Sequence, residues 1–385
     1  MTRQPQRGGS AIVGVAESDL GVVASGTTPL DLMGQAVTAA LADCGIGLDE
    51  VDGVFAAASQ LRMPTISLCE YLGLRPRYFD SSYLGGASFQ SLAAHAALAL
   101  EAGLCNVAVI AYGSTQRSAR GSFTPQRDMN EYDGLFSPRL PVTGYALAAA
   151  RHMHLHGTTR SDLADIALAA RGWAQLNPRA FDRRPLTRED VLGAPMVSAP
   201  LGAKDCCLMT DGGAAVVMVR ADRAAALKKA PVYILGTGEA QEHHSISQMP
   251  DLTVTGAARS GAQAYAMSGL TAAEIDVAQL YDAFTITTLL FLEDLGFCPK
   301  GEGGRFVQDG AIAPGGRLAV NTSGGGLSYC HPGMFGLFTM IEATRQLRGE
   351  CGERQVTGAE TAIAHGNGGV LAGQATLVLG NSATL

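Results

Sequence analysis

A tyrosine, a cysteine and a histidine stand side by side near the C-terminal end of this chain. Tyr329, Cys330 and His331 follow three consecutive glycines at 324–326. A phenol, a thiol and an imidazole offer acid, nucleophile and base chemistry, and consecutive glycines let a backbone approach a ligand closely. The pattern predicts a reactive turn. A glycine-rich turn with a buried thiol and a hydrogen-bonded histidine has the same pattern and stays open as an alternative.

The elements around this turn are predicted from their apolar periodicity. An apolar run at 318–320 precedes the turn, and an apolar helical run at 335–347 follows it. The arrangement indicates a strand, a glycine-rich turn and a helix. A comparable polar, glycine-bearing turn at 80–88 precedes an Ala- and Leu-rich helix at 89–102, which is almost uncharged and is expected to be buried on most faces.

Composition limits the classes of function. Hydrophobic residues make up 47% of the 385 and charged residues 16%, and the net charge is −7. The sequence has no basic run, which argues against nucleic acid as a partner. No apolar segment is long enough to cross a bilayer, and residues 1–9 lack the apolar core of a signal peptide. The eight cysteines show no zinc-ligand spacing and are expected to be free thiols. We therefore expect a cytoplasmic protein with a large core.

The chain reads as two similar halves. The pattern at 45–54 matches that at 269–278, and the turn at 80–88 parallels the turn at 321–333. Alternating strands and helices repeated twice predict two α/β units packed face to face, at 1–225 and 226–385. Residues of about 114–199 are richer in Arg, Pro, Met and Tyr, and we expect them to form an inserted loop domain. Both glycine-rich turns would then face one cleft, where helix N-termini offer N–H groups to an oxyanion.

Three alternating histidines lie in the inserted region, on a segment at 153–173 that is predicted to be helical. His152, His154 and His156 point apart on a helix, and no nearby carboxylate or thiol completes a familiar ligand set. Packed or solvated histidines are the better interpretation, and we predict no metal site.

The chain resembles the thiolase superfamily, in particular its sterol-carrier-protein type, over almost its whole length. The motifs that carry the resemblance lie at residues 81–88, 211–215, 281–285 with 295–299, and 321–332. The resemblance implies a duplicated thiolase fold with five layers, α/β/α/β/α, a homodimer and a CoA thioester substrate, with coenzyme A as part of the substrate and no separate cofactor. It places Gly325 and Gly326, and also His365 and Gly368 of a C-terminal glycine-rich loop, beside the CoA moiety.

The catalytic cysteines of thiolases are missing from the corresponding positions. Tyr83 stands where the nucleophilic cysteine is expected, and a phenol with a pKa near 10 is a poor acyl carrier. A His-Asp-Cys-Phe run is replaced by Tyr281, Asp282, Ala283 and Phe284, whereas the histidine of the Gly-His-Pro motif is kept as His331. What remains can stabilise an enolate and move protons.

This pattern is similar to the cysteine-lacking, thiolase-like acyl-CoA aldolases of bacterial steroid side-chain degradation. The resemblance implies retro-aldol cleavage of a β-hydroxyacyl-CoA to a ketone or aldehyde and a shorter acyl-CoA. It also implies a small partner with an OB-fold and a zinc ribbon, in a heterotetramer. We assign Tyr329 as the base and Tyr281 as the proton donor to the enolate, and the reverse assignment stays open. His331 is expected to help hold the enolate.

Other interpretations of these residues stay open. Tyr281 and Tyr329 could be packing aromatics, His331 could be structural, and Asp282 could anchor its loop through backbone hydrogen bonds. Cys330 could be an inert buried thiol or, next to His331, an activated nucleophile. A thiolase that uses Cys330 and a non-catalytic scaffold subunit are therefore the competing functions.

Overall fold

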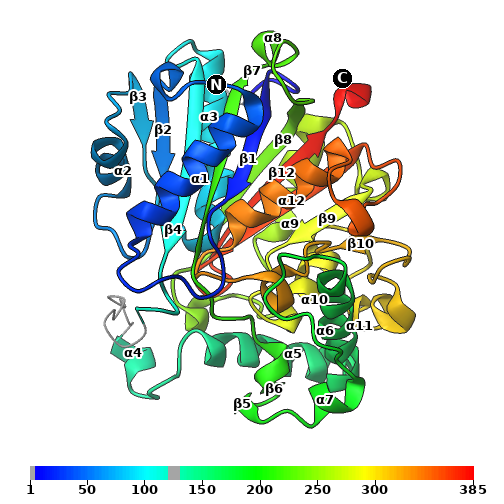
Figure 1. The fold of residues 1–385 in the computed structure, drawn as a ribbon. Coiled ribbons are helices and arrows are strands. Elements are labelled where there is room, and N and C mark those ends of the chain that lie inside the picture. The colour runs from blue at the N-terminus through cyan, green and yellow to red at the C-terminus, as the bar shows by residue number, and fades with distance from the viewer. Residues whose placement is uncertain (1–4, 120–130) are drawn as a thin grey trace.

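The computed structural model describes residues 5–119 and 131–385, and part of the predicted loop domain, 120–130, lies outside them (Figure 1). A ten-stranded sheet dominates the fold. Its strands are β1 (Ser10–Glu17), β2 (Gly53–Ala56), β3 (Tyr78–Asp80), β4 (Val107–Ser114), β7 (Gly212–Arg220), β8 (Val232–Gln241), β9 (Val277–Leu280), β10 (Ala319–Val320), β11 (Thr361–Gly368) and β12 (Gly373–Gly380).

The strand order confirms the predicted duplication. The sheet runs β10-β9-β11-β12-β8-β1-β7-β4-β2-β3. From the centre outwards, each half has two antiparallel pairings followed by two parallel ones. The halves meet where β1 pairs with β8 over two residue pairs, Ala11 with Tyr233 and Ile12 with Val232. They therefore share one continuous sheet.

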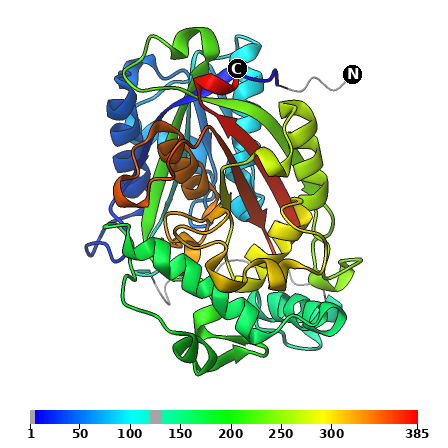
Figure 2. The same cartoon turned by 90° about the vertical axis from the view of Figure 1, so that its right-hand side faces the viewer.

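Four long helices complete the layers. They are α1 (Pro29–Cys44), α3 (Ser88–Glu101), α9 (Ala257–Ser268) and α12 (Gly336–Arg348). The α1 helix packs on strands of the first half and α9 on strands of the second, whereas α3 and α12 contact each other and strands of both halves (Figure 2). The two halves of the sheet therefore form two β layers, with α3 and α12 between them and α1 and α9 on the outside. This is the predicted order α/β/α/β/α. The α3 helix carries no charge before Glu101, and burial of most of its residues confirms that prediction.

The region between β4 and β7 lies below the sheet in Figure 1. The remaining elements of the fold, most of them in this region, are α2 (Pro64–Leu72), α4 (Glu131–Gly134), α5 (Val142–His156), α6 (Arg160–Gln175), α7 (Arg188–Leu192), β5 (Met196–Ser198), β6 (Leu201–Gly202), α8 (Ala221–Ala224), α10 (Thr285–Asp294) and α11 (Gly303–Phe306). Among the described residues, no helix has the length and apolar character needed to span a membrane.

The single helix predicted at 153–173 is wrong, because two helices occupy this stretch. The α5 helix ends at Gly157, whose φ of 73° is left-handed, and Thr159 forms a capping box with Asp162 that begins α6. His152 is fully buried on α5 and contacts Thr158 and Glu293 through its two ring nitrogens, at 2.9 and 3.1 Å. This histidine is therefore a packed, hydrogen-bonded core residue.

Candidate active site

A cavity of about 600 Å³ lies where the two glycine-rich turns meet. Gly85 and Gly86 contribute from the turn before α3, and His331 and Gly333 from the turn before α12. The other walls come from the loop domain, the segment before β7 and the ends of β9 and β11, and they include Tyr83, Pro141, Val142, Tyr145, Cys206, Cys207, Met209, Tyr281, Phe284, Asn367 and Gly369. The two turns predicted to share one cleft therefore do so.

Tyr281 and His331 form a hydrogen-bonded pair in this cavity. Both side chains are buried, and the Tyr281 hydroxyl lies 3.0 Å from Nε2 of His331. The same hydroxyl accepts a hydrogen bond from the backbone N–H of Phe335, at 3.2 Å, and lies 3.4 Å from the carbonyl oxygen of Gly333. Because Phe335 is the N-cap residue of α12, the positive end of this helix faces the phenol oxygen.

Burial sets the protonation of the pair. Loss of water raises the pKa of Tyr281 well above its usual value and lowers the pKa of His331 to about 4. At neutral pH the phenol is therefore protonated and the imidazole is neutral. A neutral imidazole can accept the phenol proton, so the two residues form a donor and an acceptor in one hydrogen bond.

The turn that carries His331 is held by Asp282. The Asp282 carboxyl group accepts hydrogen bonds from the backbone N–H groups of Gly326 and Leu327, at 2.6 and 3.2 Å. Gly325 has a φ of +61°, and a Cβ at this residue would lie 2.0 Å from the Asp282 carboxylate, so the turn requires glycine here. The predicted anchoring role of Asp282 matches these contacts. Burial raises its pKa to about 7.

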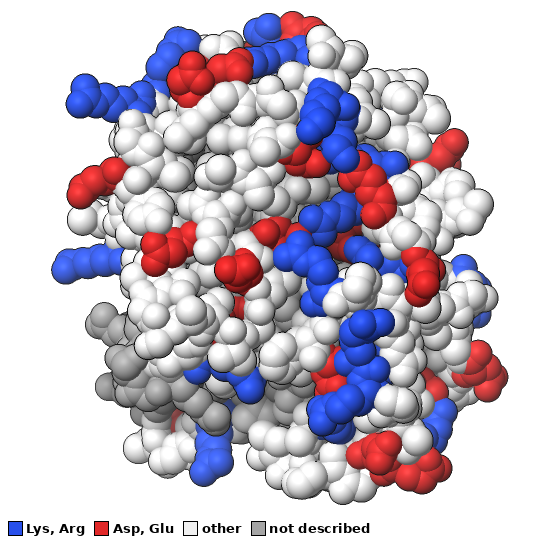
Figure 3. All heavy atoms as spheres, viewed as in Figure 1, with Lys and Arg blue, Asp and Glu red and all other residues white. Residues whose placement is uncertain are grey.

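The structure does not bring Tyr329 to the cavity, which argues against its prediction as the base. Its hydroxyl donates to Glu17, at 2.8 Å, and Glu17 is held by Arg345 and Arg179. Burial alone would raise the pKa of Glu17, but the charge of Arg345 and its hydrogen bonds outweigh this and hold the pKa at about 2. Figure 3 shows basic side chains gathered on the face of the molecule where Figure 1 places α12 and α6. Tyr329 therefore ties the turn to a buried ion pair.

The thiols are poorly placed or poorly ionised. Cys330 is fully buried and does not line the cavity, and burial raises its pKa well above the usual value. Cys206 and Cys207 do line the cavity, but burial raises the pKa of Cys206 to about 12 and that of Cys207 further. A thiolate is the reactive form of cysteine, so none of these three is a ready nucleophile.

The four residues predicted to lie beside CoA are behind the cavity wall. The prediction of a glycine-rich loop at His365 is wrong, because strand β11 continues to Gly368. His365 is fully buried between Gln374 and Thr376, each 2.9 Å from one ring nitrogen. Gly325 and Gly326 pack on Asp282, and Gly368 packs on the backbone of Leu84 and Gly85. Their neighbours Asn367 and Gly369 line the cavity instead.

Sequence reasoning gave no role to Tyr145, Cys207 or Asn367. Tyr145 lies on an apolar helix of the loop domain, 222 and 224 residues before the groups that its hydroxyl contacts, Asn367 and Gly369. No local motif marks it. Asn367 lies two residues after His365, and the alternation of a strand, which places the two on one face, is the signal that could have found it.

Comparison with known proteins shows the family of the chain. Residues 238–381 match the family described as "Thiolase C-terminal domain-like". The 17-hydroxy-3-oxo-4-pregnene-20-carboxyl-CoA lyase of Mycobacterium tuberculosis is 36% identical over 89% of this chain and 92% of its own length. The acetyl-CoA acetyltransferase of Methanothermobacter thermautotrophicus is 32% identical over 93% of this chain and 96% of its own.

The chain belongs to the thiolase superfamily.

A solved structure of this superfamily, the "Ltp2-ChsH2(DUF35) aldolase", matches with a TM-score of 0.89 and 31% identity over 97% of this chain and 98% of that one. The superfamily resemblance stated from sequence is thereby confirmed, together with its duplicated fold. Tyr83, which the sequence resemblance placed where thiolases have their nucleophilic cysteine, lines the cavity and is 65% exposed.

Proposed function

We propose that this protein is a carbon–carbon lyase that cleaves a β-hydroxyacyl-CoA by a retro-aldol reaction. The observation that carries the proposal is the hydrogen bond of 3.0 Å between Tyr281 and His331 in a cavity whose two thiols, Cys206 and Cys207, have raised pKa values. Such a site moves protons but is poorly equipped to carry an acyl group. The names of two similar proteins, a lyase and an aldolase, support the same reaction.

The pair supplies both proton transfers of the reaction. The β-hydroxyl proton passes to the Tyr281 oxygen while the phenol proton moves to Nε2 of His331. The oxygen lone pair then forms the new C=O bond, the Cα–Cβ bond breaks, and its electrons move to the thioester as an enolate. The proton returns through Tyr281 to Cα. No electrons or protons are gained or lost overall, so the reaction needs no cofactor besides the CoA of its substrate.

For the acyl group of the substrate, we propose a chemical class and no single compound. A cavity of about 600 Å³ is within the usual range of ligand sites, and the substrate named for the M. tuberculosis lyase is a steroid CoA thioester. We infer a bulky, tertiary β-hydroxyacyl group with a steroid-like side chain. The unpaired state of all eight cysteines supports the expected reducing, cytoplasmic compartment.

The test is a cleavage assay with tertiary β-hydroxyacyl-CoA thioesters that carry steroid, aromatic or short branched β-substituents. We expect a ketone and the shorter acyl-CoA in equal amounts, detected by mass spectrometry. Release of free CoA without a ketone, or no cleavage of any of these thioesters with or without the partner described below, would contradict the proposal.

An acyl transfer reaction is the second candidate, because the similar protein of M. thermautotrophicus is named as an acetyltransferase and Cys207 lines the cavity. Cys330, which lies next to His331 in the sequence, is fully buried and does not line the cavity. Incubation with acetyl-CoA followed by intact-protein mass spectrometry separates the two functions, because acyl transfer through a thiol adds an acetyl group to the protein.

We also propose a partner subunit. The similar solved structure is named as an assembly of two components, and the exposed mouth of this cavity includes Tyr83. We infer a small OB-fold and zinc-ribbon protein that completes the site, in a heterotetramer of two copies of each chain. Co-expression with such a protein, followed by sedimentation analysis and the cleavage assay, tests this inference.

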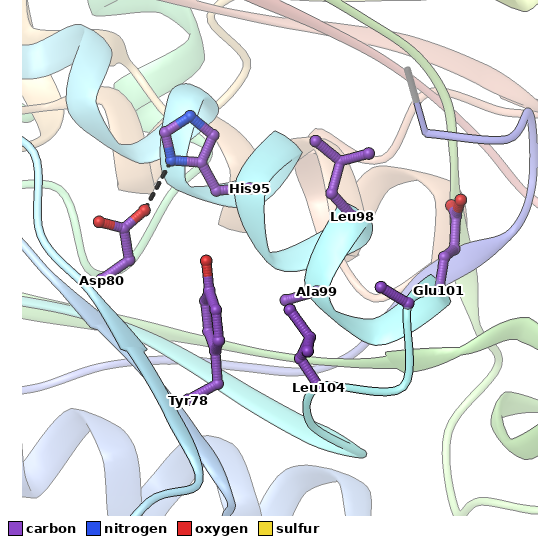
Figure 4. A pocket seen from close by; sticks show the side chains of 8 residues that line it. Tyr78, Asp80, His95, Leu98, Ala99, Glu101 and Leu104 are labelled. Atoms are coloured by element: carbon purple, nitrogen blue, oxygen red, sulfur yellow. Dashed lines mark hydrogen bonds and ion pairs between the residues drawn. The ribbon is translucent and has the colours of Figure 1, made fainter. Parts of the chain in front are cut away.

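The edge of the sheet at β3 supports the homodimer within that assembly. This strand ends the sheet, and Phe79 on it is 61% exposed. A neighbouring hollow of about 440 Å³ between β3 and α3 is lined by Tyr78, Leu98 and Leu104, with His95 and Asp80 paired at its rim (Figure 4). An unpaired strand edge with apolar side chains is a typical association surface. Phe79→Lys is expected to shift the protein toward monomer in sedimentation.

A further inference from the structure

A chain of buried polar side chains leads from the cavity wall into the core. Tyr145 and Asn367 line the cavity. Four further side chains follow behind them, and all six are at most 2% exposed: Tyr145, Asn367, Gln374, His365, Thr376 and Ser260. Buried polar groups are costly unless every one of them is hydrogen-bonded, so a chain this long requires an explanation.

Each link is a hydrogen bond of ordinary length. They are Asn367 Nδ2 to Tyr145 Oη at 2.9 Å, Gln374 Nε2 to Asn367 Oδ1 at 2.8 Å, His365 Nε2 to Gln374 Oε1 at 2.9 Å, His365 Nδ1 to Thr376 Oγ1 at 2.9 Å, and Thr376 Oγ1 to Ser260 Oγ at 2.8 Å. At the cavity end, the Tyr145 hydroxyl donates to the carbonyl oxygen of Gly369, also at 2.9 Å.

These bonds have one consistent direction. A carbonyl oxygen only accepts, so the Tyr145 proton points at Gly369, and Tyr145 must accept from the Asn367 amide. The Asn367 oxygen then faces Gln374, whose oxygen in turn accepts from Nε2–H of His365. If every donor and acceptor of the chain were exchanged, the chain would end on a hydrogen bond from the Ser260 hydroxyl to the Ala257 carbonyl oxygen, at 3.4 Å. That bond is long, so the direction toward the cavity is favoured.

His365 fits this direction because it stays neutral. Burial lowers its pKa to about 3, so one ring nitrogen donates and the other accepts. With Nε2 as the donor, the amide groups of Gln374 and Asn367 are each held in a single orientation. The Asn367 nitrogen carries two hydrogens, and Tyr145 takes one of them.

We propose that the second N–H of Asn367 binds the thioester oxygen of the acyl-CoA and holds the enolate formed after carbon–carbon cleavage. Asn367 is then a catalytic residue, and His365 is a positioning residue that keeps its amide nitrogen toward the cavity. This assignment rests on the proposed lyase function. It explains why a polar chain crosses a hairpin, β11–β12, that is already paired along eight residues.

The test separates the oxygen-binding role from the cleavage reaction. In D2O, an active site that stabilises a thioester enolate exchanges the Cα hydrogens of propionyl-CoA. The proton goes from Cα to the Tyr281–His331 pair, the electrons go to the thioester oxygen, and a deuteron from solvent returns to Cα. Exchange followed by NMR requires no β-hydroxy substrate, so it can succeed even if the proposed cleavage fails.

Four variants are compared with the unmodified protein in both assays, with thermal unfolding as the control for folding. Asn367→Asp keeps the shape of the side chain but removes both N–H groups. His365→Phe keeps the buried ring but loses the donor, and His365→Gln restores an N–H toward Gln374. His152→Phe is the matched control, because His152 is equally buried and lies outside this chain and the cavity lining.

We expect Asn367→Asp to lower the exchange rate by about 10²–10³-fold, as for other oxyanion donors, with little change in KM for cleavage. His365→Phe should lower kcat by at least tenfold and His365→Gln should recover most of it, whereas His152→Phe should affect only unfolding. Exchange and kcat in Asn367→Asp within threefold of the unmodified protein would overturn the proposal, and so would an unmodified protein that neither exchanges nor cleaves. Exchange without cleavage would refute the lyase function alone.

Discussion

The hydroxyl of Tyr281 lies 3.0 Å from Nε2 of His331, although 50 residues separate the two in the chain. Three features of the fold create this contact. Tyr281 follows directly after β9, Asp282 fixes the turn that precedes His331, and the Phe335 N–H at the start of α12 donates to the phenol oxygen. The pair is therefore a product of the duplicated architecture, in which both glycine-rich turns end at one place.

Gly86 leaves the space that the Tyr281 ring occupies. A Cβ at this residue would lie 2.0 Å from Cε2 of Tyr281 and 2.7 Å from the carbonyl oxygen of Asn367. Gly86→Ala should therefore displace the ring and lower kcat by roughly 10²-fold, the scale reported for misplacements of about 1 Å. Gly172→Ala is the matched control, since its new methyl group would lie 3.3 Å from Pro314, a much milder contact than the 2.0 Å at Gly86. Equal turnover of the two variants would show that the ring position is unimportant.

Tyr329→Phe should affect stability more than turnover. The Tyr329 hydroxyl donates to the buried Glu17 carboxylate, and hydrogen bonds to charged groups are worth about 1.5–3 kcal/mol. We expect the free energy of unfolding to fall by about this amount in urea denaturation, while kcat falls less than tenfold. A loss of 10²-fold or more with unchanged stability would restore Tyr329 as a direct participant.

The pH dependence follows from the lowered pKa of His331. Its pKa is about 4 in the folded protein and near 6.5 in the unfolded chain, so the unfolded chain binds more protons between these values. The contribution of His331 to the free energy of unfolding should therefore rise with pH across the window from about 4 to 6.5, and kcat/KM should stay level down to about pH 5. A His331→Gln variant should show a smaller pH slope of the unfolding free energy. An acidic limb of kcat/KM near 6.5 would contradict the assigned protonation.

The thiols should stay unmodified during turnover. Cys206 and Cys207 line the cavity with raised pKa values, so iodoacetamide at pH 7 should react slowly with them, and intact mass after turnover should show no added acyl group. A substrate-dependent mass increase on Cys207 would instead favour acyl transfer.

The repeat and the motif resemblance predicted the fold and part of the site. Apolar periodicity located the strands, the repeated turns indicated two equivalent halves, and the loss of cysteines at Tyr83 and at Ala283 pointed to His331 and Tyr281. These two are the predicted residues that meet in the cavity. Local patterns were sufficient here because each residue lies within a motif of its own.

The remaining residues depended on contacts that no local pattern encodes. Tyr329 looked reactive beside His331, but adjacent residues in an extended or turning backbone point in different directions, and Glu17 on β1 determines where this phenol points. His365 was expected in a loop, yet pairing with β12 keeps it in a strand. Tyr145 reaches Asn367 only through tertiary packing of the loop domain.

Turnover of Tyr281→Phe tests the central claim most directly. The measurement is single-turnover cleavage of a tertiary β-hydroxyacyl-CoA by the protein, alone and with the proposed partner, with urea denaturation as the control. We expect the rate to fall by at least 10²-fold, the usual contribution of a general acid or base, and the free energy of unfolding to fall by about 1–2 kcal/mol because the Phe335 N–H loses its acceptor. A folded Tyr281→Phe variant that cleaves the thioester at the unmodified rate would contradict the account.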